Sequence, residues 1–189
     1  SEVILNTTRR EGLKSIQNIP PEKLRDIKGV QPGIENILKT LPGVSINNEM
    51  STQYSVRGGN FDENLVYVNG IEIYRPFLIR SGQQEGLSFV NSEMTDDIKF
   101  SSGGFEAKYG DKMSSVLDIK YKSPDSNQYR INTSFLGGSF TSENISKDKN
   151  ISNILGLRYR DNSLLVNSKE ISSNFKPSFF DLQNHLRPV

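Results

Sequence analysis

Few residues in this chain have the types and the spacing that catalysis or metal binding requires. His185 is the only histidine and there is no cysteine, so a zinc centre would need carboxylates, which show no recognisable ligand spacing. A serine triad would lack the Gly-x-Ser-x-Gly turn that exposes the nucleophile. Asp62-Glu63 and Asp96-Asp97 are sequence neighbours, and neighbours on a strand point to opposite faces. We therefore predict no enzyme activity, no catalytic or metal-binding residue and no cofactor.

The glycine pairs are the remaining candidates for chemistry, as phosphate-binding loops. Gly58-Gly59 and Gly103-Gly104 lie neither in a Gly-x-Gly-x-x-Gly pattern nor before Lys-Ser/Thr, the arrangements whose backbone amides cradle phosphates. Lys+Arg 23 against Asp+Glu 22 leave a net charge of +1, which gives no general attraction to nucleic acid. We therefore expect neither nucleotide binding nor a nucleic-acid partner.

Composition indicates a chain that keeps much of its surface in contact with water or a polar cavity. Apolar residues make up 34% and the mean hydropathy is −0.53, which is low for a compact soluble domain. No window reaches the roughly 18 consecutive apolar residues of a membrane-spanning helix, which leaves spanning by β-strands open. The chain starts at Ser1 without an export-signal pattern, and we expect it to be a piece of a longer protein.

The first elements expected are an extended arm and two short helical segments. Residues 1–11 are polar and unpatterned, and we expect a flexible lead-in there. Between residues 13 and 27, Pro20-Pro21 stop a helix from running through, which predicts an extended arm followed by a short helical turn. A helix is predicted from Pro32 to Pro42-Gly43, because its apolar residues Ile34, Ile37, Leu38 and Leu41 follow helical spacing.

Strands separated by glycines come next. Apolar residues at 66, 68, 71 and 73 flank Asn69-Gly70, the dipeptide that best tolerates the positive φ angles of a type I′ turn, which predicts a β-hairpin. Residues 98–100 and 116–121 are predicted strands, with glycines at 103, 104 and 110 between them. Together these elements indicate a small mixed α+β domain that ends near Lys122.

The pattern changes after a polar linker at residues 123–128. Apolar and polar residues alternate over 129–135 and again over 151–159, where Arg158 and Arg160 fall on the face opposite Leu155 and Leu157. A third strand is expected within 175–186. Segments of about ten residues with this period are typical of transmembrane barrel strands, but a soluble β-sandwich strand has the same pattern. Both alternatives stay open on these residues alone.

Four glycine-marked segments, taken in order, carry a resemblance to a known family. They are residues 53–59, 65–74, 98–110 and 115–120, with the motif residues Gly58, Gly59, Asn69, Gly70, Gly103, Gly104 and Gly110. The set resembles the plug domain of TonB-dependent outer-membrane receptors, with Asn69-Gly70 where most relatives carry Asp-Gly. The Ser-Gly-Gly sequence at residues 102–104 is similar to the corresponding sequence in receptors of Bacteroidetes-type bacteria.

The resemblance implies an α+β fold, with a small mixed-sheet plug domain at 12–122 followed at 123–189 by an incomplete set of antiparallel transmembrane-barrel-type strands. It implies an outer-membrane active transporter whose plug occludes the barrel lumen, binds nutrient at its outer face and is opened by TonB-coupled energy. The implied partners are the protein's own β-barrel, a TonB-type energy transducer, and a nutrient such as a siderophore, cobalamin, a sugar or a peptide. No TonB box is identifiable in residues 1–12. The full-length protein would lie in the bacterial outer membrane, whereas this piece alone is expected to be soluble.

The resemblance also places candidate ligand-binding residues in the loops that meet the nutrient. They are Arg57, Tyr74, Arg75, Phe77, Arg80, Gln83 and Gln84. For Arg57 the favoured alternative is a structural ion pair with a carboxylate such as Glu72 or Glu106. For the segment after Tyr74 the alternative is an ordinary solvated loop.

A second function remains open, a soluble extracellular or periplasmic binding or adhesion module with a β-rich fold. In that case the strands after residue 128 would complete a sandwich with the preceding ones. In the first case, strands without the rest of a barrel have open edges. We then expect residues 123–189 to be irregular or to self-associate, and a closed sandwich would refute this expectation.

Overall fold

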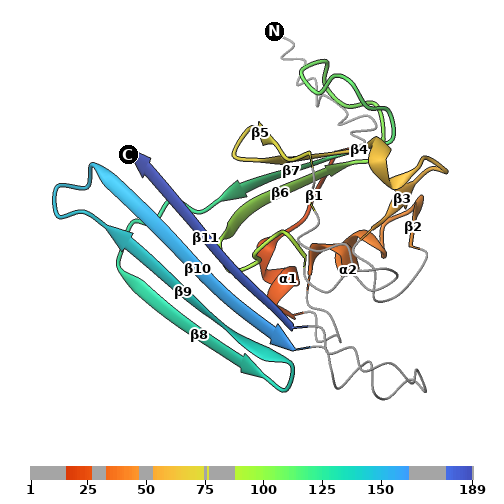
Figure 1. Ribbon diagram of the computed structural model, residues 1–189. Coiled ribbons are helices and arrows are strands. Elements are labelled where there is room, and N and C mark those ends of the chain that lie inside the picture. The colour runs from red at the N-terminus through yellow and green to blue at the C-terminus, as the bar shows by residue number, and fades with distance from the viewer. Residues whose placement is uncertain are drawn as a thin grey trace, which may run out of the picture.

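The computed structural model describes residues 16–26, 33–46, 53–74, 76, 88–161 and 178–188. Two sheets make up most of this part of the chain. A five-stranded mixed sheet has the order β1-β6-β7-β4-β5, and a four-stranded antiparallel sheet has the order β11-β10-β9-β8. Figure 1 shows the antiparallel sheet slanting along one side of the domain that contains the mixed sheet. Within the described residues, no helix is both long and apolar enough to cross a membrane.

The N-terminal elements follow the predicted arm and helices. β1 (Ile16–Asn18) pairs with β6 at the edge of the mixed sheet, and α1 (Pro21–Asp26) begins at the second proline because proline fits the first helical turn. α2 (Ile34–Leu38) buries its three apolar residues, as their spacing predicts, and ends before Pro42-Gly43. The arm and both helices are confirmed over the described residues.

The predicted hairpin lies in the mixed sheet. β4 (Asn64–Val68) and β5 (Ile71–Glu72) pair antiparallel, and Asn69 and Gly70 between them have φ of 52° and 80°, the left-handed values of a type I′ turn. β6 (Thr95–Ser101) and β7 (Ser115–Tyr121) are the two further predicted strands and pair antiparallel. β7 runs parallel to β4, which makes the sheet mixed. The hairpin and both strands are confirmed.

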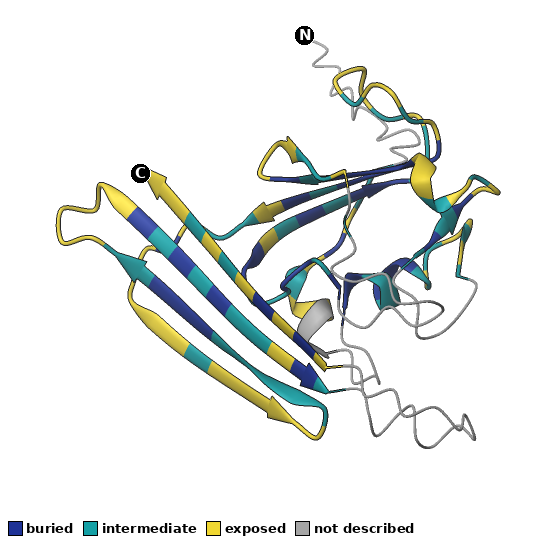
Figure 2. Ribbon diagram, viewed as in Figure 1, coloured by how far each residue is buried: buried dark blue, intermediate teal, exposed yellow. Residues whose placement is uncertain are grey.

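The hydrophobic core of this domain lies between the mixed sheet and α2. The buried cluster comprises Ile19, Ile34, Ile37, Leu38, Tyr54, Val56, Val66, Val68, Val90, Ile98, Phe100, Leu117 and Ile119. A two-stranded pair, β2 (Val44–Ser45) and β3 (Ser55–Val56), and the 3-10 helix η1 (Phe61–Glu63) complete the domain. Figure 2 shows buried residues along the central strands of the mixed sheet and on α2. Removing this apolar surface from water is the main stabilising term of the domain.

The antiparallel sheet contains the strands expected after the linker and one that was not predicted. β8 (Gln128–Ser134), β10 (Ile151–Asp161) and β11 (Ser178–Pro188) match the predicted segments over the described residues. β9 (Gly137–Ile145) pairs with both β8 and β10, although it begins with two glycines and carries only two large apolar residues. Backbone pairing on both edges holds β9 in place, and such pairing leaves no signature in the strand's own sequence.

The expectation of irregular structure in residues 123–189 is wrong for the described strands. The three longest strands, β9, β10 and β11, each pair with a neighbour along nearly their whole described length. Strands that follow one another in sequence can form such antiparallel ladders through short connections. The sheet is open, with β8 and β11 at its edges. The described strands therefore do not form the closed sandwich of the alternative hypothesis.

Candidate functional site at the interface of the two sheets

Only two of the predicted ligand-binding residues fall within the described part of the chain. Tyr74, after β5, is 78% exposed, and Arg57, in the turn after β3, is exposed with φ of 51°. Arg75, Phe77, Arg80, Gln83 and Gln84 lie outside the described residues. No hydrogen bond joins Arg57 to Tyr74 in the described structure.

The favoured ion pair of Arg57 with Glu72 or Glu106 is wrong. Glu106 pairs instead with Lys108 at 2.9 Å, and among the described residues neither carboxylate pairs with Arg57. The left-handed backbone at Arg57 directs its side chain toward the turn after β6, where a Cβ at Gly103 would lie 3.2 Å from the guanidinium. Gly59 lies close to a neighbouring side chain, because a Cβ there would lie 1.8 Å from Ser114 Oγ.

The densest group of polar contacts in the described structure lies between the two sheets. Arg158 of β10 donates hydrogen bonds to the carbonyl oxygens of Val90, Ser88 and Phe89 at 2.9, 3.0 and 3.3 Å. Its Nε also donates to Asp181 Oδ2 at 3.0 Å, and only 12% of the Arg158 side chain is exposed. Three backbone carbonyls and one carboxylate thus surround a nearly buried guanidinium.

Neighbouring residues of the antiparallel sheet extend this group. Gln183 of β11 donates to Phe89 O at 2.8 Å and to Asp181 Oδ2 at 3.1 Å, and its Oε1 accepts from the Tyr121 hydroxyl at 2.7 Å. Burial raises the pKa of Tyr121 to about 12, so this phenol remains a donor at physiological pH. Every carbonyl and carboxylate in the group has a donor, as buried polar groups require.

A second set of contacts lies close to the covalent link between the sheets. Glu143 of β9 pairs with Lys122 Nζ at 3.1 Å and also with Arg130 of β8. The ring of His185 lies edge-on to Tyr121 with centroids 6.0 Å apart, and His185 also lies within 3.5 Å of Asn69 Nδ2. These residues bring the end of β7 and the type I′ turn against the antiparallel sheet.

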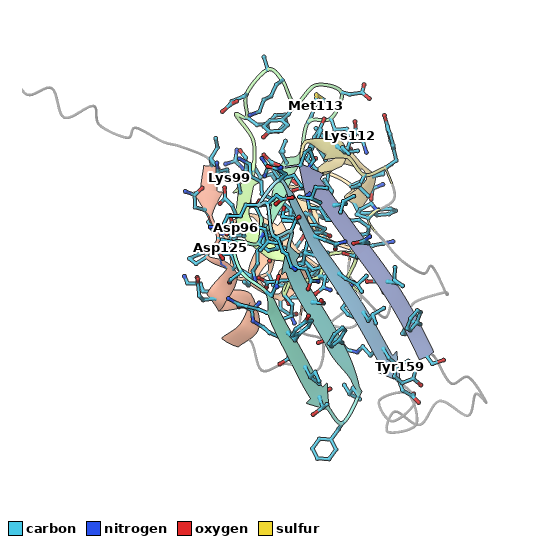
Figure 3. The ribbon with its side chains drawn as sticks, turned by 90° about the vertical axis from the view of Figure 1, so that its left-hand side faces the viewer. Asp96, Lys99, Lys112, Met113, Asp125 and Tyr159 are labelled. Atoms are coloured by element: carbon cyan, nitrogen blue, oxygen red, sulfur yellow. The ribbon has the colours of Figure 1, made fainter. Side chains whose placement is uncertain are left out.

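The two faces of the antiparallel sheet differ in chemistry. The face turned to the mixed sheet, here called the inner face, is mostly polar. It carries Arg130, Thr141, Glu143, Arg158, Asp181 and Gln183, together with the buried apolar residues Ile154 and Phe179. The outer face carries apolar residues that remain exposed, namely Tyr129, Ile131, Ile151, Tyr159, Phe180, Leu182 and Leu186. Figure 3 looks onto this outer face, with Tyr159 labelled toward the end of β10. A water-soluble sandwich would place these faces the other way round, with its apolar side chains inward.

Sequence reasoning found the alternation of β10 but not the contacts that it makes. The period-2 pattern placed Arg158 opposite Leu157, which is correct. The partners of Arg158 are backbone carbonyls, and a backbone carbonyl has no residue type by which a sequence could reveal it. Among the described residues, no group of three or more His, Cys, Asp or Glu side chains is placed to hold a metal ion.

Three solved structures have a similar fold and much longer chains than this one. The siderophore receptor PirA from Acinetobacter baumannii matches with a TM-score of 0.60 and 19% identity over 93% of this chain and 29% of its own. The ferric enterobactin receptor PfeA from Pseudomonas aeruginosa, as its Q482A mutant with enterobactin, matches with 0.60 and 16% over 92% and 30%. The outer membrane transporter YddB from Escherichia coli matches with 0.57 and 16% over 78% and 26%.

These likenesses cover both sheets, so the fold is that of a plug domain followed by part of a receptor barrel. The chain spans less than a third of the length of these structures. A comparison with curated protein sequences finds no match. The family model described as the TonB-dependent Receptor Plug Domain matches residues 8–116, more than half of the chain. The chain therefore belongs to the TonB-dependent receptor plug domain family.

Proposed function

We propose that this chain supplies the plug and part of the barrel wall of an outer-membrane active transporter. The plug occludes the barrel lumen, binds a nutrient at its outer face and is opened by energy from a TonB-type transducer. The observation that carries the proposal is the orientation of the antiparallel sheet, which turns its polar face to the plug and its apolar face outward. The proposed division of the chain is a lead-in at 1–11, the plug at 12–122 and wall strands from 123 onward.

The physical argument rests on what surrounds each face of the sheet. A transmembrane β-barrel alternates lipid-facing and lumen-facing side chains, with an apolar band outside and a polar interior. A wide lumen lined by polar groups needs a plug that can hydrogen-bond to it. Arg158, Gln183 and Glu143 make such bonds to the plug here, while Leu182 and Leu186 are 58% and 62% exposed.

The nutrient can be proposed only as a chemical class. The solved structures of similar fold include a siderophore receptor, a ferric enterobactin receptor and a receptor bound to pyoverdine. They support an iron-chelate ligand over the alternatives of cobalamin, a sugar or a peptide. The residues proposed to contact it are Arg57, Tyr74, Arg75, Phe77, Arg80, Gln83 and Gln84. The Ser-Gly-Gly sequence at residues 102–104 supports a receptor of the Bacteroidetes type.

The experiment that tests the proposal is expression of the full-length protein in a Gram-negative host, followed by membrane fractionation. We expect it in the outer-membrane fraction, with faster migration on denaturing gels before heating than after. A chain recovered in the periplasm or medium would support the soluble binding module instead. Growth of a deletion strain on single iron chelates, cobalamin, sugars or peptides would then identify the nutrient class, and a TonB-deficient strain should show the same growth defect.

A further inference from the structure

Arg158 and Gln183 hold the plug at a place far in sequence from its covalent attachment. The plug continues into the barrel wall at residues 122–127, so contacts made by Tyr121 and Lys122 lie beside that link. The hydrogen bonds from Arg158 and Gln183 to residues 88–90 span 68 to 94 positions along the chain. They therefore attach the plug to the wall at a second place, distant from the link in sequence.

The held segment is well suited to such a restraint. Phe89 and Val90 lie outside any strand, so their carbonyl oxygens have no ladder partner and accept side-chain donors. On the plug side, Ser88 Oγ donates to Glu35 Oε1 of α2 at 2.7 Å and accepts from Val90 N at 3.2 Å. The segment is thus tied to the plug core on one side and to the wall on the other.

Gly156 allows the residues that directly follow this segment to approach the wall closely. A Cβ at Gly156 would lie 2.5 Å from Asn91 Nδ2 and 2.6 Å from Met94 Sδ, so these two buried side chains would have to shift. Asn91 Nδ2 and Thr141 Oγ1, both buried here, have no protein hydrogen-bond partner in the described structure. The polar attraction at this contact is therefore concentrated in Arg158 and Gln183, and Gly156 supplies the space.

We propose that Arg158, supported by Asp181 and Gln183 and seated beside Gly156, is a latch that retains the plug. Opening of the lumen requires its hydrogen bonds to residues 88–90 to break. The inference rests on the proposed transport function and adds the residue that controls release. Asp181 acts as a positioning residue, because it pairs with the guanidinium and does not itself bond the plug backbone.

Passage of a large hydrophilic antibiotic such as vancomycin through the full-length receptor tests the latch. The host lacks TonB, so that only spontaneous opening is measured. Truncating one partner of a buried charged contact costs about 2 kcal/mol or more, which corresponds to about a 30-fold larger open population. We expect Arg158→Leu to lower the inhibitory vancomycin concentration clearly. Arg158→Lys should have a smaller effect, because it keeps the charge, but it should still leak, because an ammonium lacks the planar fork that reaches all three carbonyls.

The control is Arg187→Leu, which removes an exposed arginine of β11 that makes no hydrogen bond to residues 88–90 in the described structure. It should leave the inhibitory concentration at the wild-type value. Gly156→Val tests the close approach at Gly156 without changing Arg158, and it should also let vancomycin through. Conversely, Asn91→Cys combined with Gly156→Cys should form a disulfide that stops nutrient uptake in a TonB-containing strain until a reductant is added.

A receptor with the plug deleted separates failure of the latch from failure of the proposed function. If that variant admits vancomycin while Arg158→Leu is as tight as wild type, the latch is refuted and the transporter stands. If the plug-deleted protein makes no pore, the transport proposal itself fails, and the latch with it. Unheated gel migration of each variant shows whether its barrel has folded, so a leak is scored only for folded receptors.

Discussion

Replacing Leu182 with arginine distinguishes a lipid-facing sheet from one that faces water. Leu182 is near the middle of β11 and pairs with Leu157, which in turn pairs with Phe140, so it belongs to an apolar row across the outer face. Leu186 is an internal control, because it is 62% exposed against 58% for Leu182 but pairs with Asn153 near the strand end. In water the two substitutions would be equally mild.

The magnitudes follow from the depth of each position. Four residues of strand span about 13 Å, and a tilt of about 45° places Leu186 about 9 Å closer to the membrane surface than Leu182. Arginine at the bilayer midplane costs about 2–4 kcal/mol, and near the interface about 0–1 kcal/mol. We therefore expect Leu182→Arg to destabilise the receptor by about 2 kcal/mol more than Leu186→Arg does.

The assay is equilibrium unfolding by denaturant of the full-length receptor in lipid vesicles, followed by gel migration and by fluorescence. The same two variants are also compared for the fraction that reaches the folded form in the outer membrane. Equal effects within about 0.5 kcal/mol, the range of ordinary surface substitutions, would contradict a lipid-facing outer surface. That outcome would favour the soluble binding module.

Three further outcomes are expected for the plug. Burial raises the pKa of the Glu35 carboxyl, so the stability that this group contributes is present at low pH and is lost as the pH rises above about 4.5. In denaturant titrations, Glu35→Gln should therefore gain stability relative to wild type as the pH rises. A difference in unfolding free energy between the two proteins that stays constant with pH would contradict this. Gly70→Val should lower the free energy of unfolding by about 1–2 kcal/mol, because φ is 80° there and no neighbour lies within 4 Å, so the cost is one of backbone conformation alone. Tyr121→Phe should cost about 0.5–1.5 kcal/mol through loss of the bond to Gln183. Because the pKa of Tyr121 is raised to about 12, that loss should be the same from neutral pH to about pH 10, and a strong pH dependence would argue against the hydrogen bond.

Local features of the plug were predictable because each depends on a few neighbouring residues. The type I′ turn follows from Asn69-Gly70, and the start of α1 follows from Pro21. The spacing of apolar residues in α2 likewise predicted which of them are buried. The ordered glycine segments indicated the family, which the match to residues 8–116 bears out.

Other features could not be read from the sequence because they depend on partners distant along the chain. β9 is a strand because β8 and β10 pair with its two edges, not because of its own residues. Arg57 pairs with neither Glu72 nor Glu106, the two carboxylates expected, because the turn conformation directs its side chain to Gly103. The hydrogen bonds of Arg158 to residues 88–90 join a side chain to backbone carbonyls, which carry no sequence signal.

The amino-acid sequence alone determined which residues of each wall strand share a face, since successive side chains alternate with a period of two. It did not determine which face turns inward, because the alternation is the same for a soluble sandwich and for a barrel wall. Only the tertiary structure decided this, by placing Arg158 and Gln183 against the plug and leaving Leu182 outside. The physical reason is that a buried guanidinium needs acceptors, which the carbonyls of residues 88–90 supply, whereas an apolar side chain can face outward if lipid surrounds it.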